Sequence, residues 1–131
     1  MTLTREEIQG MKPGREMDAL IAEKVLGWTD IKRVNPAVIH SFSADGNHAN
    51  FGFSPVLYKH VPFPLYSTDI SAAWEVVTHL KSKYWYFMLS DENEGWEASF
   101  YWDPHRPAFE AVSATAPEAI CKAALLAVLK L

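Results

Sequence analysis

The stretch YSTDISAAWEVVTHL, from Tyr66 to Leu80, joins a helix start signal to a helical pattern of apolar residues. Ser67 and Thr68 are residue types that cap helix N-termini, and Asp69 adds a negative charge where the helix dipole is positive. The apolar residues behind them recur at intervals of three and four, on one helix face: Ile70, Ala73, Trp74, Val77 and Leu80. This pattern predicts a helix over about residues 68–82, and its polar start needs no ligand to explain it.

The period of the apolar residues changes directly after this helix. Residues 84–89, YWYFML, are apolar on both alternations, which predicts a strand that is covered on both faces. Two polar turns separate this strand from two further segments with strand-like alternation. We therefore predict a three-stranded antiparallel meander over residues 84–90, 96–102 and 108–114.

An earlier helix is predicted over about residues 13–26. Pro13 suits its first turn, and Gly27 supplies the left-handed residue at which it stops. Its apolar residues share one face: Met17, Leu20, Ile21 and Val25. Before this helix, Thr4 and Glu7 have the spacing of a capping box, which predicts a short N-terminal turn.

The last predicted helix, over about residues 116–130, has the strongest start signal. Thr115 is the cap, and Glu118 is placed to reach back to the backbone of Thr115, as in a capping box. Glu118 and Lys122 lie one turn apart and are predicted to form an ion pair on the surface. The inward face is apolar and contains Ile120, Cys121, Ala124, Leu125 and Val128.

Residues 29–65 carry turn signals and prolines instead of a long periodic pattern. The dipeptide Asp45-Gly46 is a hairpin signal. Pro55, Pro62 and Pro64 then interrupt the chain repeatedly. This spacing predicts an extended segment along the surface, without a buried strand.

Together these elements predict one α+β domain over residues 1–131. Three amphipathic helices need apolar partners, and the first strand of the meander needs cover on both sides. Helices on both faces of the antiparallel sheet meet both needs. We therefore predict an α/β/α sandwich.

The composition limits the classes of partner. The 131 residues carry a net charge of −4 and no run of Lys or Arg, so nucleic acid is not the expected partner. The single cysteine, Cys121, excludes an internal disulfide and fits a reducing compartment. The sequence has no N-terminal signal core and no run of about 20 apolar residues, so we expect a cytoplasmic location and no membrane partner.

Three blocks join the start and stop signals to long matched runs: GREMDALIAEKVLGW at 14–28, YSTDISAAWEVV at 66–77 and ATAPEAICKAALLA at 114–127. In sequence and order, these blocks resemble the phage ABA-sandwich domain family. The resemblance spans the chain and is weak between residues 29 and 65. It implies a bacteriophage or prophage origin, a bacterial host cell and a helix–sheet–helix fold. It implies no reaction, and it transfers no catalytic residue to this chain.

No catalytic or metal-binding constellation is predicted, and no cofactor. The histidines are scattered without metal-ligand spacing, at His40, His48, His60, His79 and His105. Cys121 lies on the apolar face of the last helix, where a small buried hydrophobe is a better interpretation than a nucleophile.

The candidate binding residues are aromatic and arginine side chains: Trp28, Arg33, Trp96, Trp102 and Arg106. Tryptophan rings can stack on a base or nucleotide, and arginine can bind an anion. The alternative interpretation is core or rim packing for the rings and solvated surface charge for the arginines. A binding site is predicted between residues 28 and 66 and at the turn from Asp103 to Arg106.

Three functions follow from these observations. The first is a non-enzymatic phage or prophage accessory protein that binds a protein partner or a second copy of itself. The second is a protein that binds or sequesters a small ligand, such as a nucleotide-like signal of the host. The third is an uncharacterised enzyme, for which the sequence offers no catalytic residue.

Overall fold

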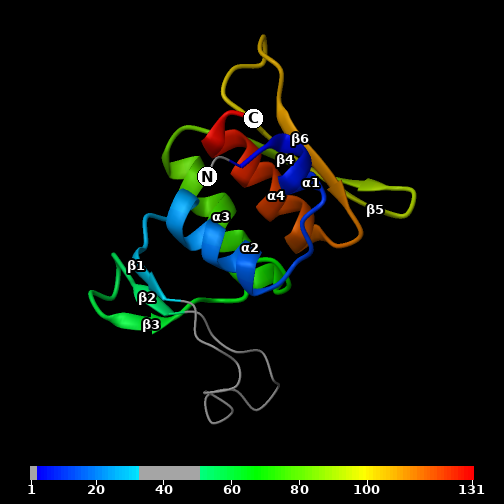
Figure 1. Ribbon diagram of the computed structural model, residues 1–131. Coiled ribbons are helices and arrows are strands. Elements are labelled where there is room, and N and C mark those ends of the chain that lie inside the picture. Colours follow the sequence, from blue (N-terminus) through cyan, green and yellow to red (C-terminus); the bar gives the residue numbers. More distant parts are fainter. Residues whose placement is uncertain (1–2, 33–50) are drawn as a thin grey trace.

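The structure is a computed structural model that describes residues 3–32 and 51–131. The α-helices are α1 (Arg5–Gln9), α2 (Arg15–Leu20), α3 (Ile70–Ser82) and α4 (Ala116–Leu129), and α2 continues into a π-helical turn, η1 (Ile21–Val25) (Figure 1). The strands are β1 (Thr29–Lys32), β2 (Phe51–Phe53), β3 (His60–Pro62), β4 (Tyr86–Glu92), β5 (Gly95–Tyr101) and β6 (Phe109–Ser113). The predicted α+β class is confirmed.

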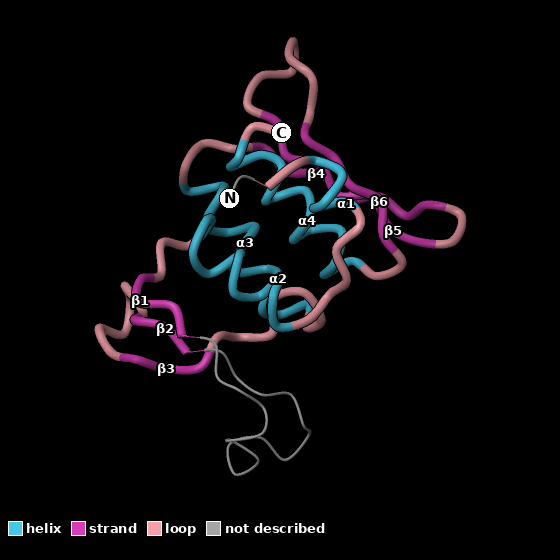
Figure 2. The backbone as a smooth tube through the Cα atoms, in the orientation of Figure 1, coloured by secondary structure: helices cyan, strands magenta, loops and turns pink. Residues whose placement is uncertain are grey.

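The strands form two separate antiparallel sheets, with the orders β1-β2-β3 and β4-β5-β6 (Figure 2). The second sheet is the predicted meander, with Phe87 opposite Phe100 and Phe100 opposite Phe109. The first sheet adds three short strands to residues 29–65, and β3, the strand within the proline-rich segment that was predicted to be extended and not buried, lies at the sheet edge with Pro62 exposed. Pro62 is tolerated there because it ends β3, an edge strand of this sheet. The hairpin predicted at Asp45-Gly46 lies outside the described residues.

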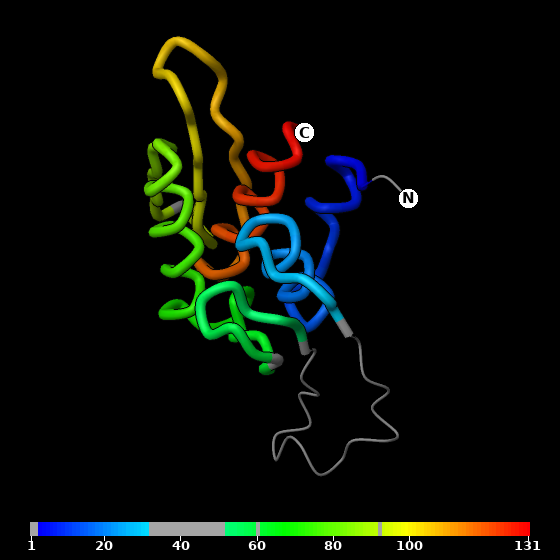
Figure 3. The backbone as a smooth tube through the Cα atoms, turned by 90° about the vertical axis from the view of Figure 1, so that its left-hand side faces the viewer, coloured from blue at the N-terminus to red at the C-terminus, as the bar shows by residue number. Residues whose placement is uncertain are grey.

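Helix α4 is the centre of the core. Residues 119–127 are all buried, so α4 is covered on every side instead of on one stripe. It packs on β5 and β6, on α3, and on α1 and η1. Figure 3 shows α4 between α3 on one side and the N-terminal helices on the other. Its alanines permit this close approach from several directions.

One face of the β4-β5-β6 sheet is open, which corrects the prediction that residues 84–89 are covered on both faces. Phe87 and Leu89 pack against the core, whereas Tyr86 and Met88 are 56% and 55% exposed. Helix α3 contacts the inward side of the sheet through Trp74 and Phe87, and α4 packs over the inward Phe100. The two helices that cover the sheet therefore lie on the same side.

The N-terminal helices follow most of the predicted signals. The capping box at Thr4 and Glu7 is confirmed and starts α1. Helix α2 begins at Arg15, after an N-cap glycine with φ 152°, and not at Pro13. Gly27 ends the helical segment with φ 78°, as predicted, because a left-handed residue lets the backbone turn away at low steric cost.

The N-terminus of α3 differs from the prediction. Asp69 is the N-cap, and its Oδ1 accepts from the backbone N–H of Ser71 at 3.1 Å. Ser67 is fully buried and has another role, described below. Ile70 and Trp74 are about half-exposed, so the buried stripe of α3 is narrower than predicted.

The charged residues of α4 also differ from the prediction. Thr115 caps the helix, but the Glu118 carboxylate accepts from Lys122 Nζ at 2.7 Å instead of reaching back to Thr115. The predicted surface pair is largely buried, with 7% of the Lys122 side chain and 15% of the Glu118 side chain exposed. The reason is α1, whose Gln9 carbonyl oxygen lies 2.8 Å from Lys122 Nζ.

Candidate functional site

The first two sequence blocks meet in a buried hydrogen-bond network. Asp18 Oδ1 on α2 accepts from the backbone N–H of Ser67 at 2.8 Å and from Ser67 Oγ at 2.7 Å. The backbone N–H of Gly14 donates to Ser67 Oγ at 2.9 Å. Burial raises the pKa of Asp18, and the hydrogen bonds from Ser67 lower it in part. The network ties the start of α2 to the segment that leads into α3.

The third block joins the same junction. Cys121 Sγ on α4 donates to the carbonyl oxygen of Tyr66 at 3.2 Å. Burial raises the pKa of the Cys121 thiol, and the negative charges of Asp18 and Glu118 raise it further. A buried thiol with a raised pKa stays protonated near neutral pH and is a poor nucleophile. The residues of the junction (Asp18, Tyr66, Ser67, Cys121) are buried, which favours an architectural role for the three blocks.

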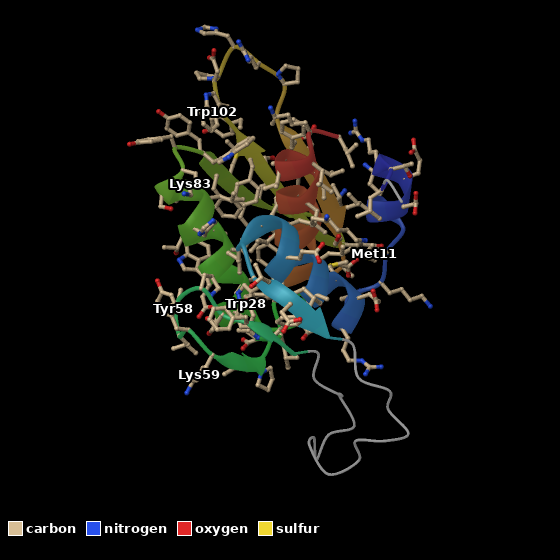
Figure 4. All side chains as sticks on the ribbon, turned by 60° about the vertical axis from the view of Figure 1, so that its left-hand side comes forward. Met11, Trp28, Tyr58, Lys59, Lys83 and Trp102 are labelled. Carbon is tan, nitrogen blue, oxygen red and sulfur yellow. The ribbon has the colours of Figure 1, made fainter. Side chains whose placement is uncertain are left out.

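The five candidate binding residues do not form one site. Trp28 is buried and packs edge-to-face on Phe63, with 5.0 Å between ring centroids, so the ring belongs to the core (Figure 4). Arg33 lies outside the described residues. Trp96 lies at the beginning of β5, partly exposed. Trp102 and Arg106 line the same pocket.

This pocket lies where the inward side of the sheet extends beyond the end of α4. Its volume is about 590 Å³. Three rings line it, and the Trp85 ring centroid is 5.2 Å from that of Trp102 and 6.0 Å from that of Phe109. Arg5 of α1, Arg106 of the β5–β6 loop and Lys130 at the end of α4 bring positive charge to it.

Four of these lining residues were missed by sequence reasoning: Arg5, Trp85, Phe109 and Lys130. Trp85 lies within an apolar run that predicts a buried strand, so the sequence pattern does not mark it as a binding residue. Arg5 and Lys130 lie at opposite ends of the chain, and only the packing of α1 on α4 brings them to one pocket. No local pattern in the sequence contains that information.

The open face of the meander is the second surface feature. Tyr86 on β4 stacks on Tyr101 on β5, with 5.3 Å between ring centroids and 18° between ring planes. Met88 follows Tyr86 on the same face of β4. We call Tyr86, Met88 and Tyr101 the outer patch. Residues 84–89 are apolar at every position, so their sequence does not distinguish this open face from a face that is covered.

Residues 3–32 and 51–131 contain no candidate metal site and no candidate membrane-spanning helix. No group of three or more His, Cys, Asp or Glu side chains that would hold a metal ion is found there. The helices of the same residues are too short or too polar to cross a membrane.

Comparisons with known proteins show the family and include a similar solved structure. The profile of the phage ABA sandwich domain matches residues 19–125. The fold is similar to the crystal structure of a phage protein from Bacillus cereus ATCC 14579, with a TM-score of 0.58 and 28% sequence identity, over 95% of this chain and 96% of that chain. A search of curated proteins found no match.

Proposed function

The chain belongs to the phage ABA-sandwich domain family, and on that premise we propose that it is a phage or prophage accessory protein that associates with a second copy of itself through the outer patch. The family match supports a phage protein. The proposal of self-association is supported by the exposed apolar residues on the outer face of the β4-β5-β6 sheet.

The exposure of the outer patch is the observation that carries this proposal. An antiparallel sheet with one solvated face normally presents polar residues there. Here Tyr86 and Met88 are both more than half exposed at adjacent outward positions of β4. Contiguous exposed apolar surface of this kind marks interaction sites, because its burial removes apolar area from water.

The chemistry of the outer patch fits a protein partner. Tyrosine and methionine are enriched at the centres of protein interfaces. The stacked rings of Tyr86 and Tyr101 form a flat surface with few rotatable bonds, so docking costs little side-chain entropy. Val112 on β6 is also exposed and lies on the same face of the sheet, opposite Glu97 on β5. Two copies stacked on this face would each cover the apolar surface that the other leaves open.

Size-exclusion chromatography with light scattering tests the proposal over a range of protein concentrations. We expect the wild type to form dimers and Met88→Lys to remain a monomer, because a charge at the interface centre is costly to desolvate. Val56→Lys is the matched control, since Val56 is also an exposed apolar residue but lies in the β2–β3 turn. A wild type that stays monomeric at every concentration, or dimers that survive Met88→Lys, would overturn the proposal.

A further inference from the structure

We infer that the pocket at the end of α4 binds a small anionic ligand that carries a flat ring, in the chemical class of a nucleoside monophosphate. This inference concerns a different surface from the outer patch and does not depend on self-association. The pocket volume of about 590 Å³ lies in the range of pockets that hold small ligands.

The aromatic residues of the pocket supply faces for a ring. Trp102 is 53% exposed, and Trp85 and Phe109 are half-buried behind it. The rings of Trp85 and Trp102 stand at 82° to one another, so together they form a corner and not a closed stack. A planar ring that enters this corner can lie flat on one indole and place its own edge against the face of the other, and such stacking and edge contacts hold bases without sequence readout.

The charges of the pocket favour an anion. The lining residues contribute three positively charged side chains, Arg5, Arg106 and Lys130, and one acidic side chain, Glu110. Within residues 3–32 and 51–131, these three side chains form no ion pair and no side-chain hydrogen bond. They are gathered in one place although the whole chain carries a net charge of −4. A phosphate can accept several charge-assisted hydrogen bonds from such groups, and arginine can donate two at once.

Local hydrogen bonds at the end of α4 reduce the negative partial charge that a helix C-terminus would present to an anion. The carbonyl groups of a last helical turn carry negative partial charge, which disfavours an anion nearby. Here the backbone N–H of Lys130 donates to Ala127 O at 3.2 Å, and that of Leu131 donates to Leu126 O at 2.9 Å. Two of those carbonyl groups are therefore satisfied locally. The side chain of Lys130 adds a positive charge at the same end.

The same observations favour a free small molecule over a nucleic-acid strand. A strand-binding surface tracks the backbone with cations spread along a groove. The cations here instead come from three separate elements and converge on one hollow, and the net charge of the chain repels a polyanion. A ligand with one ring and one phosphate group satisfies both parts of the pocket.

Isothermal titration calorimetry on the full chain tests the inference with AMP, GMP, CMP and UMP as probes. We expect at least one monophosphate to bind with a Kd below about 1 mM and to weaken as salt rises. The corresponding nucleoside and inorganic phosphate alone are expected to bind about tenfold more weakly or worse, because each uses only one part of the pocket. A single-stranded oligonucleotide that binds more tightly than every monophosphate would contradict a small-ligand site.

Arg106→Gln and Trp102→Leu are the test variants, because both side chains are exposed and their replacement leaves the core intact. Each is expected to weaken binding about tenfold, the effect of one strong contact. Lys59→Gln is the matched control: Figure 4 places Lys59 in the β2–β3 turn, at the opposite end of the molecule from Trp102. Binding by no monophosphate below about 1 mM, or equal loss in Arg106→Gln and Lys59→Gln, would overturn the inference.

Discussion

Replacement of Lys122 by methionine is predicted to destabilise the protein strongly. Lys122 Nζ donates to Glu118 Oε2 at 2.7 Å and to Gln9 O at 2.8 Å, with only 7% of its side chain exposed. Methionine keeps an unbranched apolar stem of similar length, so packing along α4 is largely retained. The substitution therefore isolates the loss of the ammonium group.

The size of the stability loss follows from the two groups that Lys122→Met leaves without a partner. The Glu118 carboxylate loses its cation while its side chain is only 15% exposed, and the Gln9 carbonyl oxygen loses its donor. Breaking a buried ion pair costs about 3–5 kcal/mol, and partial access of water to Glu118 places the expected loss near the lower end, about 3 kcal/mol. Because Gln9 belongs to α1, the same loss loosens α1, which carries Arg5 into the pocket.

Urea unfolding followed by tryptophan fluorescence measures this loss. With m of about 2 kcal/mol/M, a loss of 3 kcal/mol lowers the midpoint by about 1.5 M. Lys24→Met is the matched control, because Lys24 and Glu23 form a 3.1 Å pair with 42% and 43% of their side chains exposed. That control is expected to cost less than about 1 kcal/mol. The double variant Glu118→Met, Lys122→Met is expected to recover part of the stability, since it leaves no unpaired carboxylate.

Equal midpoints for Lys122→Met and Lys24→Met would refute this reasoning. Such a result would mean that the Glu118–Lys122 pair is solvated and that α1 does not cover it. A double variant less stable than Lys122→Met alone would refute the claim that an unpaired buried carboxylate causes the loss.

Three further predictions address the core and the junction. Gly95→Ala is expected to cost about 1–3 kcal/mol in urea unfolding, because the added Cβ overlaps the carbonyl oxygen of Ser113 on β6; an unchanged midpoint would contradict the close approach. Cys121 is expected to react with a thiol reagent only at the rate of unfolding, because it is buried with a raised pKa, and fast labelling of the native protein would contradict this. The raised pKa of Asp18 means that its contribution to stability is fully present below the ordinary value of 3.8 and declines as pH rises through the raised value, so Asp18→Asn should flatten the pH dependence of the unfolding free energy in that window.

The elements of the fold were predictable wherever local signals agreed. The helices and the meander follow from periodicity, caps and turns, which depend on neighbours in the sequence. The cap of α3 was not predictable, because Ser67, Thr68 and Asp69 are all suitable by type. Ser67 does not cap α3 because its hydroxyl donates to Asp18, 49 residues earlier, in the core.

The missed features depend on long-range packing. The β1-β2-β3 sheet has strands of three or four residues, too short for a periodic signal, and β1 and β2 are far apart in sequence. The pocket combines α1, the residue before β4, the β5–β6 loop, β6 and the end of α4, so its cations and rings share no sequence window. The open face of the meander required knowing that α3 and α4 lie on one side of the sheet.

The central claim is that the first two sequence blocks serve to hold α2 against the start of α3. A double-mutant cycle with Asp18→Ala and Ser67→Ala measures it most directly, by urea unfolding of the two single variants and the double variant. We predict a coupling energy of about 1.5 kcal/mol or more, and a larger loss for Asp18→Ala, because Ser67 donates to Asp18 through both its hydroxyl and its backbone N–H. Single variants that each cost less than about 0.5 kcal/mol and combine without coupling would contradict the claim.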